Sequence, residues 1–139
     1  MSGYPESIVF DTEPLVAYFC NEPGSDTVER HLAAVERASD GYISAVNLAE
    51  LHYVVRSIVG KERADTVVDV LEESGIERVD TDETWPTAAG FKSRYSPALG
   101  DAFALATAEH VDGTLLIGAD DDYDDVADID LVRFRTDGV

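Results

Sequence analysis

The chain has 139 residues, of which 29 are acidic and 10 basic, so its formal net charge is −19. This length suits one domain with its own hydrophobic core, and we expect a single domain over residues 1–139. The lone cysteine, Cys20, excludes a disulfide framework and a cysteine-based zinc site. No apolar run approaches the ~20 residues of a membrane span, and the N-terminal segment lacks the features of a signal peptide. We therefore expect a cytoplasmic protein without a membrane contact.

The acidic residues are spread along the whole chain, which favours an acidic folded surface over a disordered acidic tail. Only two basic residues are lysines, Lys61 and Lys92. This combination is similar to proteins of halophilic organisms, whose cytoplasm holds molar salt. Enzymes that act on nucleic acid usually have a basic surface, and this chain has none. In molar salt the Debye length falls to about 3 Å, so short-range contacts and metal bridges to phosphate would have to carry such binding.

The first half of the chain alternates short apolar runs with longer helical patterns. Strands are predicted at 7–10 and 42–45, where β-rich runs end at polar or turn residues. Apolar residues that recur every three or four positions predict helices at 11–19, 26–38, 46–59 and 61–74. Pro14 falls in the first turn of the first helix, where its missing N–H costs nothing. Gly60 is a helix terminator.

The second half continues the same alternation. Strands are predicted at 76–79, 114–118 and 131–134. Helices are predicted at 83–95, with Trp85 and Phe91 as core anchors, and at 99–111, an alanine-rich segment that can pack close to a sheet. An acidic loop should occupy 120–130. Regular alternation of strands and helices favours an α/β fold with a parallel sheet.

Four acidic residues fall where such a fold binds ligands, beyond the carboxyl ends of its strands. Asp11 directly follows the first strand, and Glu50 lies in the first turns of the helix after the second. Asp101 opens the alanine-rich helix, and Asp120 follows the strand TLLIG, with Asp122 close behind. Taken singly, Asp11, Glu50 and Asp101 are explained at least as well as helix caps or solvated first-turn acids. Asp120 is explained as well by a solvated acidic loop. Their joint placement suggests a site.

A cluster of carboxylates at one edge of a sheet implies a cation, because buried like charges are costly unless they are neutralised. Oxygen ligands without a histidine or cysteine cluster suit Mg²⁺ or Mn²⁺. Such an ion can polarise a phosphate and lower the pKa of a bound water, which then attacks the phosphorus. The pattern therefore favours a divalent-metal site that can act on a phosphate group.

Four segments, spread over nearly the whole chain, resemble the PIN-domain family and especially the VapC-type toxin ribonucleases: IVFDTEPLVAYF, ISAVNLAEL, LGDAFALATA and LLIGADDDY. By this resemblance Asp11, Glu50, Asp101 and Asp120 form the catalytic quartet, and Asp11, Asp101 and Asp120 bind the metal. Thr12 and Ser44 match hydroxyl positions around the quartet. The family usually has threonine where this chain has Gly118, so Asp122 is kept as a replacement or supplement for Asp120.

The resemblance implies a three-layer α/β/α fold with a five-stranded parallel sheet. It also implies a Mg²⁺- or Mn²⁺-dependent endoribonuclease that hydrolyses RNA phosphodiester bonds, as the toxin of a VapBC-type toxin–antitoxin pair. The expected partners are an RNA substrate, a cognate antitoxin and a second copy of the chain in a homodimer.

Two alternatives stay open. In the first, the chain has a PIN-like fold that has lost catalytic turnover, and it serves as a binding or regulatory module. The pair Asp11 and Glu13 faintly resembles the start of an aspartyl-phosphate phosphohydrolase, but that chemistry requires a second aspartate and a late lysine, and Lys61 and Lys92 fit neither place. Metal-dependent cleavage that requires Asp11 would separate these classes.

Overall fold

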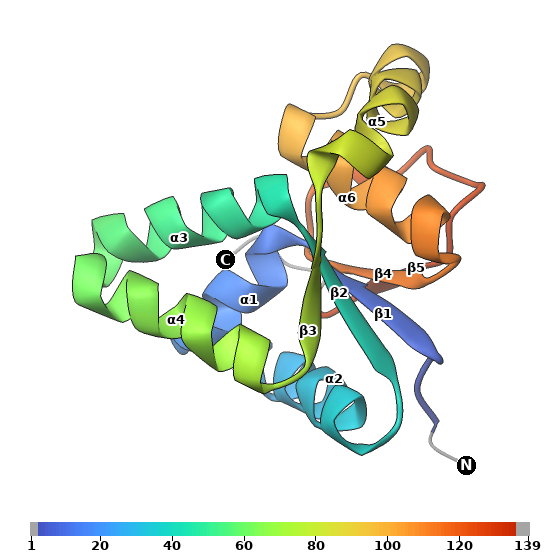
Figure 1. The fold of residues 1–139 in the computed structure, drawn as a ribbon. Coiled ribbons are helices and arrows are strands. Elements are labelled where there is room, and N and C mark those ends of the chain that lie inside the picture. Colours follow the sequence, from blue (N-terminus) through green and yellow to red (C-terminus); the bar gives the residue numbers. More distant parts are fainter. Residues whose placement is uncertain (1–2, 136–139) are drawn as a thin grey trace.

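A parallel sheet lies between two helical layers in the computed structural model, which describes residues 3–135 (Figure 1). All neighbouring strands are parallel, and their order is β3-β2-β1-β4-β5. This confirms the predicted three-layer α/β/α fold with a five-stranded parallel sheet. The strands are β1 (Ser7–Phe10), β2 (Asp40–Ser44), β3 (Ile76–Val79), β4 (Thr114–Ile117) and β5 (Leu131–Arg133).

The helices divide between the two faces of the sheet (Figure 1). One layer contains α1 (Thr12–Phe19), α2 (Ser25–Arg37), α3 (Ala45–Val59) and α4 (Lys61–Glu73). The other contains α5 (Thr81–Tyr95) and α6 (Leu99–Val111). None of the helices within residues 3–135 has the length and apolarity that crossing a membrane requires.

The central strands are apolar without interruption because both of their faces are covered. In β1, Ile8 and Phe10 pack on the α1–α4 side and Val9 on the α5–α6 side. In β4, Leu116 faces the first layer while Leu115 faces the second. This arrangement accounts for the unbroken sequences IVF and LLI, which are typical of strands buried on both sides.

The register and the packing of α6 place the carboxyl ends of the central strands beside a helix start. Val9 of β1 pairs with Tyr42 of β2 and with Leu115 of β4, so these three strands end almost level. Every residue of α6 from 100 to 108 is buried, because its small side chains let the helix lie close against the sheet. The first turn of α6 therefore reaches the same edge as the strand ends.

Most predicted elements agree with the structure to within one or two residues. The acidic loop contains a short 3₁₀ helix, η1 (Asp121–Tyr123), which is too short to give a periodic signal. The prediction that Trp85 anchors the core is wrong, since its side chain is 59% exposed. The buried face of α5 consists of Thr84, Ala88 and Phe91, and Trp85 points away from it.

Candidate metal centre

Two buried aspartates from distant parts of the chain meet at one tyrosine hydroxyl. The hydroxyl of Tyr123 lies 2.8 Å from Oδ2 of Asp11 and 3.0 Å from Oδ1 of Asp101. The three side chains are 1%, 4% and 9% exposed, respectively. A phenol carries a single proton and can donate only one strong hydrogen bond. The second contact therefore requires a proton on one of the carboxyl groups, unless a cation separates them.

Asp11 is the N-cap of α1, and its Oδ1 accepts a hydrogen bond of 2.8 Å from the backbone N–H of Thr12. Burial nevertheless raises the pKa of Asp11 to about 7, and the charges of Glu50 and Glu13 act in the same direction. The hydrogen bonds from Tyr123 and Thr12 oppose this rise without cancelling it. Asp11 is thus more than an ordinary helix cap, whose carboxylate would be stabilised in its charged form.

Asp101 lies in the first turn of α6, where the surroundings disfavour the ionised carboxylate more strongly than at Asp11. Burial raises the pKa of Asp101 to about 9, with further contributions from the charge of Asp11 and from the neighbouring carboxylates of Asp122 and Asp120. No donor within residues 3–135 reaches Oδ2 of Asp101. A buried carboxylate oxygen without a donor is the ligand that a hard divalent cation requires.

Asn47 connects the remaining members of the site. Its buried side-chain amide lies 3.3 Å from Oδ1 of Asp11, 3.1 Å from the Thr12 hydroxyl and 3.2 Å from Oε1 of Glu50. It also lies 3.1 Å from the carbonyl oxygen of Gly100 in α6. The Thr12 hydroxyl donates to the same Oε1 of Glu50 at 2.9 Å. The amide and the hydroxyl together fix the Glu50 carboxylate beside Asp11.

Ser44 stabilises this network through two hydrogen bonds with Asn47. Its hydroxyl caps α3 by accepting from the backbone N–H of Asn47 at 3.0 Å, and it donates to the side-chain carbonyl of Asn47 at 2.6 Å. The amide of Asn47 is therefore turned toward the carboxylates. The predicted supporting residue Ser44 thus acts through Asn47.

Gly100 lets the Glu50 carboxylate approach the backbone of α6. A Cβ atom on Gly100 would lie 2.2 Å from Oε1 of Glu50, which is closer than non-bonded atoms allow. The sequence LGDAFALATA thus provides both a carboxylate, Asp101, and the space for a second one. Because Gly100 has no side chain, Glu50 of α3 can reach across to α6, which carries Asp101.

Asp120 and Asp122 complete the site from the β4–β5 loop. Oδ1 of Asp120 accepts from the N–H of Asp122 at 2.9 Å, and Oδ2 of Asp122 accepts from the N–H of Ala98 at 2.9 Å. One carboxylate oxygen from each of Asp101, Asp120 and Asp122 lies within 4.8 Å of the others. Their oxygens are of the type that Mg²⁺ and Mn²⁺ bind. Asp122 thus lies with the predicted Asp101 and Asp120 in one group of possible metal ligands. Asp11 is linked to Asp101 by the Tyr123 hydroxyl, which contacts both side chains.

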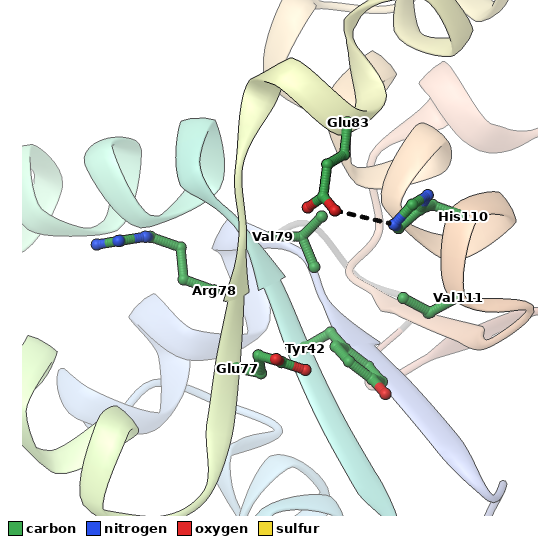
Figure 2. Close-up of a pocket in the computed structure, with 7 residues that line it drawn as sticks. All are labelled: Tyr42, Glu77, Arg78, Val79, Glu83, His110 and Val111. Carbon is green, nitrogen blue, oxygen red and sulfur yellow. Dashed lines mark ion pairs between the residues drawn. The ribbon is translucent and has the colours of Figure 1, made fainter.

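A separate surface pocket of about 280 Å³ lies beside the edge strand β3 (Figure 2). Glu83 of α5 and His110 of α6 face each other across its rim, with 3.9 Å between Oε1 and Nε2. Its walls contain Tyr42, Glu77, Arg78, Val79, Glu83, His110 and Val111. None of the four predicted acids contributes to this pocket. The predicted acids gather at the carboxyl ends of the strands.

Solved structures with the same fold include proteins of toxin–antitoxin systems. A chain of VapBC2 from Rickettsia felis, solved on a DNA fragment from its promoter, matches with a TM-score of 0.74 and 18% identity, over 91% of this chain and 98% of that one. VapBC-1 from nontypeable Haemophilus influenzae matches with a TM-score of 0.73 and 11% identity, over 92% and 98%. VapC20 from Mycobacterium tuberculosis, a sarcin-ricin loop cleaving toxin, matches with a TM-score of 0.64 and 14% identity, over 78% and 86%.

At these identities the structures show a shared fold. A comparison with curated proteins gives no match. The family model of the PIN domain matches residues 8–129, a stretch that contains all four predicted acids. This protein belongs to the PIN domain family.

Proposed function

We propose that this protein is a divalent-metal-dependent endoribonuclease, formed by a single domain over residues 1–139 in the cytoplasm. The observation that carries the proposal is the pair of buried carboxyl groups, Asp11 and Asp101, which both contact the hydroxyl of Tyr123. Oδ2 of Asp101 has no donor among residues 3–135. A Mg²⁺ or Mn²⁺ ion would satisfy that oxygen and neutralise the cluster.

The site residues divide into two groups in this proposal. Asp101 and Asp120 bind the cation, with Asp122 as a third ligand and Asp11 adjoining them. Glu50, held through Oε1 by Thr12 and Asn47, orients the attacking water. When bound, the cation lowers the pKa of that water and polarises the phosphate. The four acids Asp11, Glu50, Asp101 and Asp120 are thus the proposed catalytic residues.

We assign the protein to a VapBC-type toxin–antitoxin pair, with a cognate antitoxin as its partner and a homodimer as its assembly. Support for the antitoxin comes from the relatives of the fold, which include a toxin–antitoxin complex from Klebsiella pneumoniae and a DNA-bound VapBC from Salmonella typhimurium. The homodimer rests on the family resemblance alone.

The aspartyl-phosphate alternative finds no support among the lysines. Lys61 pairs with Asp65 at 2.6 Å on an exposed surface, and Lys92 donates to the carbonyl oxygen of Pro97. Neither contacts Asp11, so the structure offers no lysine to stabilise a phosphorylated aspartate.

The proposal is tested by incubating total RNA with the protein in molar KCl containing Mg²⁺, Mn²⁺ or EDTA. We expect discrete fragments with wild type in either metal, none in EDTA, and none with Asp11→Asn. Asp65→Asn is the matched control, since it also removes one carboxylate but lies outside the site. Fragments that form equally in EDTA would contradict a metal-dependent reaction. Folded wild-type protein that cleaves no RNA in any metal would favour the inactive binding module.

A further inference from the structure

The loop that carries Asp120 is held by an arginine of β5. The guanidinium of Arg133 donates to the carbonyl oxygen of Gly118 at 2.6 Å and to that of Asp120 at 3.1 Å. Its other terminal nitrogen donates to Oδ1 of Asp124 at 2.8 Å. Because β4 ends at Ile117, the sheet does not fix these carbonyl groups. A single planar side chain does so instead.

Glu13 also contacts this loop. Its Oε2 accepts a long hydrogen bond of 3.4 Å from the backbone N–H of Ala119 and pairs with Nε of Arg135 at 3.1 Å. The side chain of Arg135 is only 11% exposed and also donates to the carbonyl oxygen of Pro23 at 3.0 Å. Arg135 is thus held in place, and it fixes the Glu13 carboxylate against the loop.

Gly118 provides the space that the Glu13 carboxylate occupies. A Cβ atom on Gly118 would lie 2.1 Å from both Cδ and Oε2 of Glu13. The φ angle of Gly118 is not in the left-handed region, so its backbone could accept another residue. Glycine is therefore required here by the carboxylate of Glu13 and not by the backbone.

The loop needs such support because it is strongly acidic. Seven aspartates lie between residues 120 and 130, and their mutual repulsion opposes a fixed loop conformation. Among residues 3–135, the donor to the side-chain carboxylate of Asp120 is the N–H of Asp122, a residue of the same loop. Its position relative to Asp101 thus depends on the backbone from Gly118 to Asp120.

Resting on the nuclease function proposed above, we propose that Glu13, Arg133 and Arg135 form a loop clamp of positioning residues. The loop clamp fixes the backbone of residues 118–120 and thereby places the Asp120 carboxylate opposite Asp101, where both contact the same cation. None of the three clamp residues needs to touch the cation or the RNA. Their effect should therefore appear first in metal affinity and in kcat rather than in KM for RNA.

The clamp is tested by a double-mutant cycle between Glu13 and Gly118, with Mn²⁺ affinity measured by electron paramagnetic resonance of the free ion in molar KCl. Gly118→Ala is the sharper variant, because it changes no charge and displaces the Glu13 carboxylate from Ala119. We expect Glu13→Ala and Gly118→Ala each to weaken Mn²⁺ binding by about 10- to 100-fold, as for groups that orient metal ligands. The double variant should be no weaker than the worse single variant.

A second measurement reports the loop itself. Hydrogen exchange at the Ala119 amide should accelerate in Gly118→Ala and in the conservative Glu13→Gln, which retains the size of the side chain. Arg78→Gln is the matched control for a lost surface ion pair, since Arg78 pairs with Asp80 at 3.2 Å far from the loop. It should leave Mn²⁺ affinity and exchange unchanged.

The outcomes separate the clamp from the nuclease function. Losses of Mn²⁺ affinity that multiply in the double variant, or folded single variants with wild-type affinity, would overturn the clamp alone. Coupled losses in a protein that cleaves no RNA would support the clamp and overturn the nuclease. Wild type that binds no Mn²⁺ would overturn both.

Discussion

Aspartates in two regions of this molecule meet opposite environments. At the carboxyl edge of the sheet, burial raises the pKa of Asp101 to about 9, and the Asp101 carboxyl group contacts the neutral hydroxyl of Tyr123. On the exposed surface of α3 and α4, hydrogen bonds from His52 at 2.8 Å and Lys61 at 2.6 Å lower the pKa of Asp65. In a chain with 29 acidic residues, acidity alone does not mark a site. A functional site is indicated instead by buried carboxyl groups whose pKa is raised and that have no cationic partner.

The difference also appears within the site. The pKa of Asp122 is lowered by the N–H of Ala98 and by the carboxyl group of Asp101, although it lies next to the strongly shifted Asp101. The excess proton of the cluster therefore belongs to the buried pair, Asp101 and Asp11, while Asp122 stays ionised. A cation that enters the site replaces that proton, so metal binding should release protons.

The largest expected effect comes from neutralising the buried acid. Asp101→Asn should reduce cleavage by more than about 100-fold, because even residues that only orient metal ligands contribute 10- to 100-fold. In EDTA the same variant should melt at a higher temperature than wild type, since it removes a carboxyl group that is costly to ionise in place. Cleavage assays and thermal melts test the two parts. A variant that keeps wild-type activity would remove Asp101 from the site.

A smaller effect should follow from filling the space beside Glu50. Gly100→Ala places a methyl group where the Glu50 carboxylate lies, and we expect a 10- to 100-fold loss of kcat by analogy with other orienting contacts. Stability should stay equal or rise by up to about 1 kcal/mol, because alanine is the better helix former. Single-turnover kinetics and chemical denaturation would measure both. A parallel loss of stability and activity would indicate general misfolding instead.

The buried acids should also make the stability of the metal-free protein depend on pH. The folded-state pKa values of Asp11 and Asp101 lie above the usual value of 3.8. At a pH between the usual value and the folded-state values, the folded protein therefore binds more protons than the unfolded chain. The contribution of these groups is full below about pH 4 and is lost as the pH rises toward 9. Metal-free wild type in molar KCl should thus lose stability over this range. Mg²⁺ or the Asp101→Asn substitution should reduce the slope, and an unchanged slope in Asp101→Asn would contradict the assignment.

The smallest effect is expected at the compensated surface acid. Asp65→Asn removes an exposed ion pair, which typically contributes little. Cleavage rate, Mn²⁺ affinity and melting temperature should equal those of wild type. A clear loss of Mn²⁺ affinity would show that the acidic surface as a whole, and not the buried cluster, governs metal binding.

Local patterns in the sequence determined most of the fold. Periodicity and turn residues are properties of neighbouring positions, so the strands, the helices and the α/β class could be predicted from them. Each of the four acids was expected at the carboxyl edge because it follows a strand or lies in the first turns of a helix. Trp85 shows the limit of such reasoning, since an aromatic residue in a helix carries no information about which face is buried.

How the acids meet depends on contacts between residues that are far apart in the chain. Tyr123 contacts Asp11 across 112 positions of the chain, and Glu13 contacts the N–H of Ala119 across 106. Contacts of this kind depend on how the helices pack across the parallel sheet, and no local pattern encodes that packing. The hub role of Asn47, the approach of Asp122 to Asp101 and the space left by Gly118 follow from it. The order of residues along the chain predicts which carboxylates come to the edge of the sheet, whereas side-chain packing brings Asp11 and Asp101 to the same Tyr123 hydroxyl.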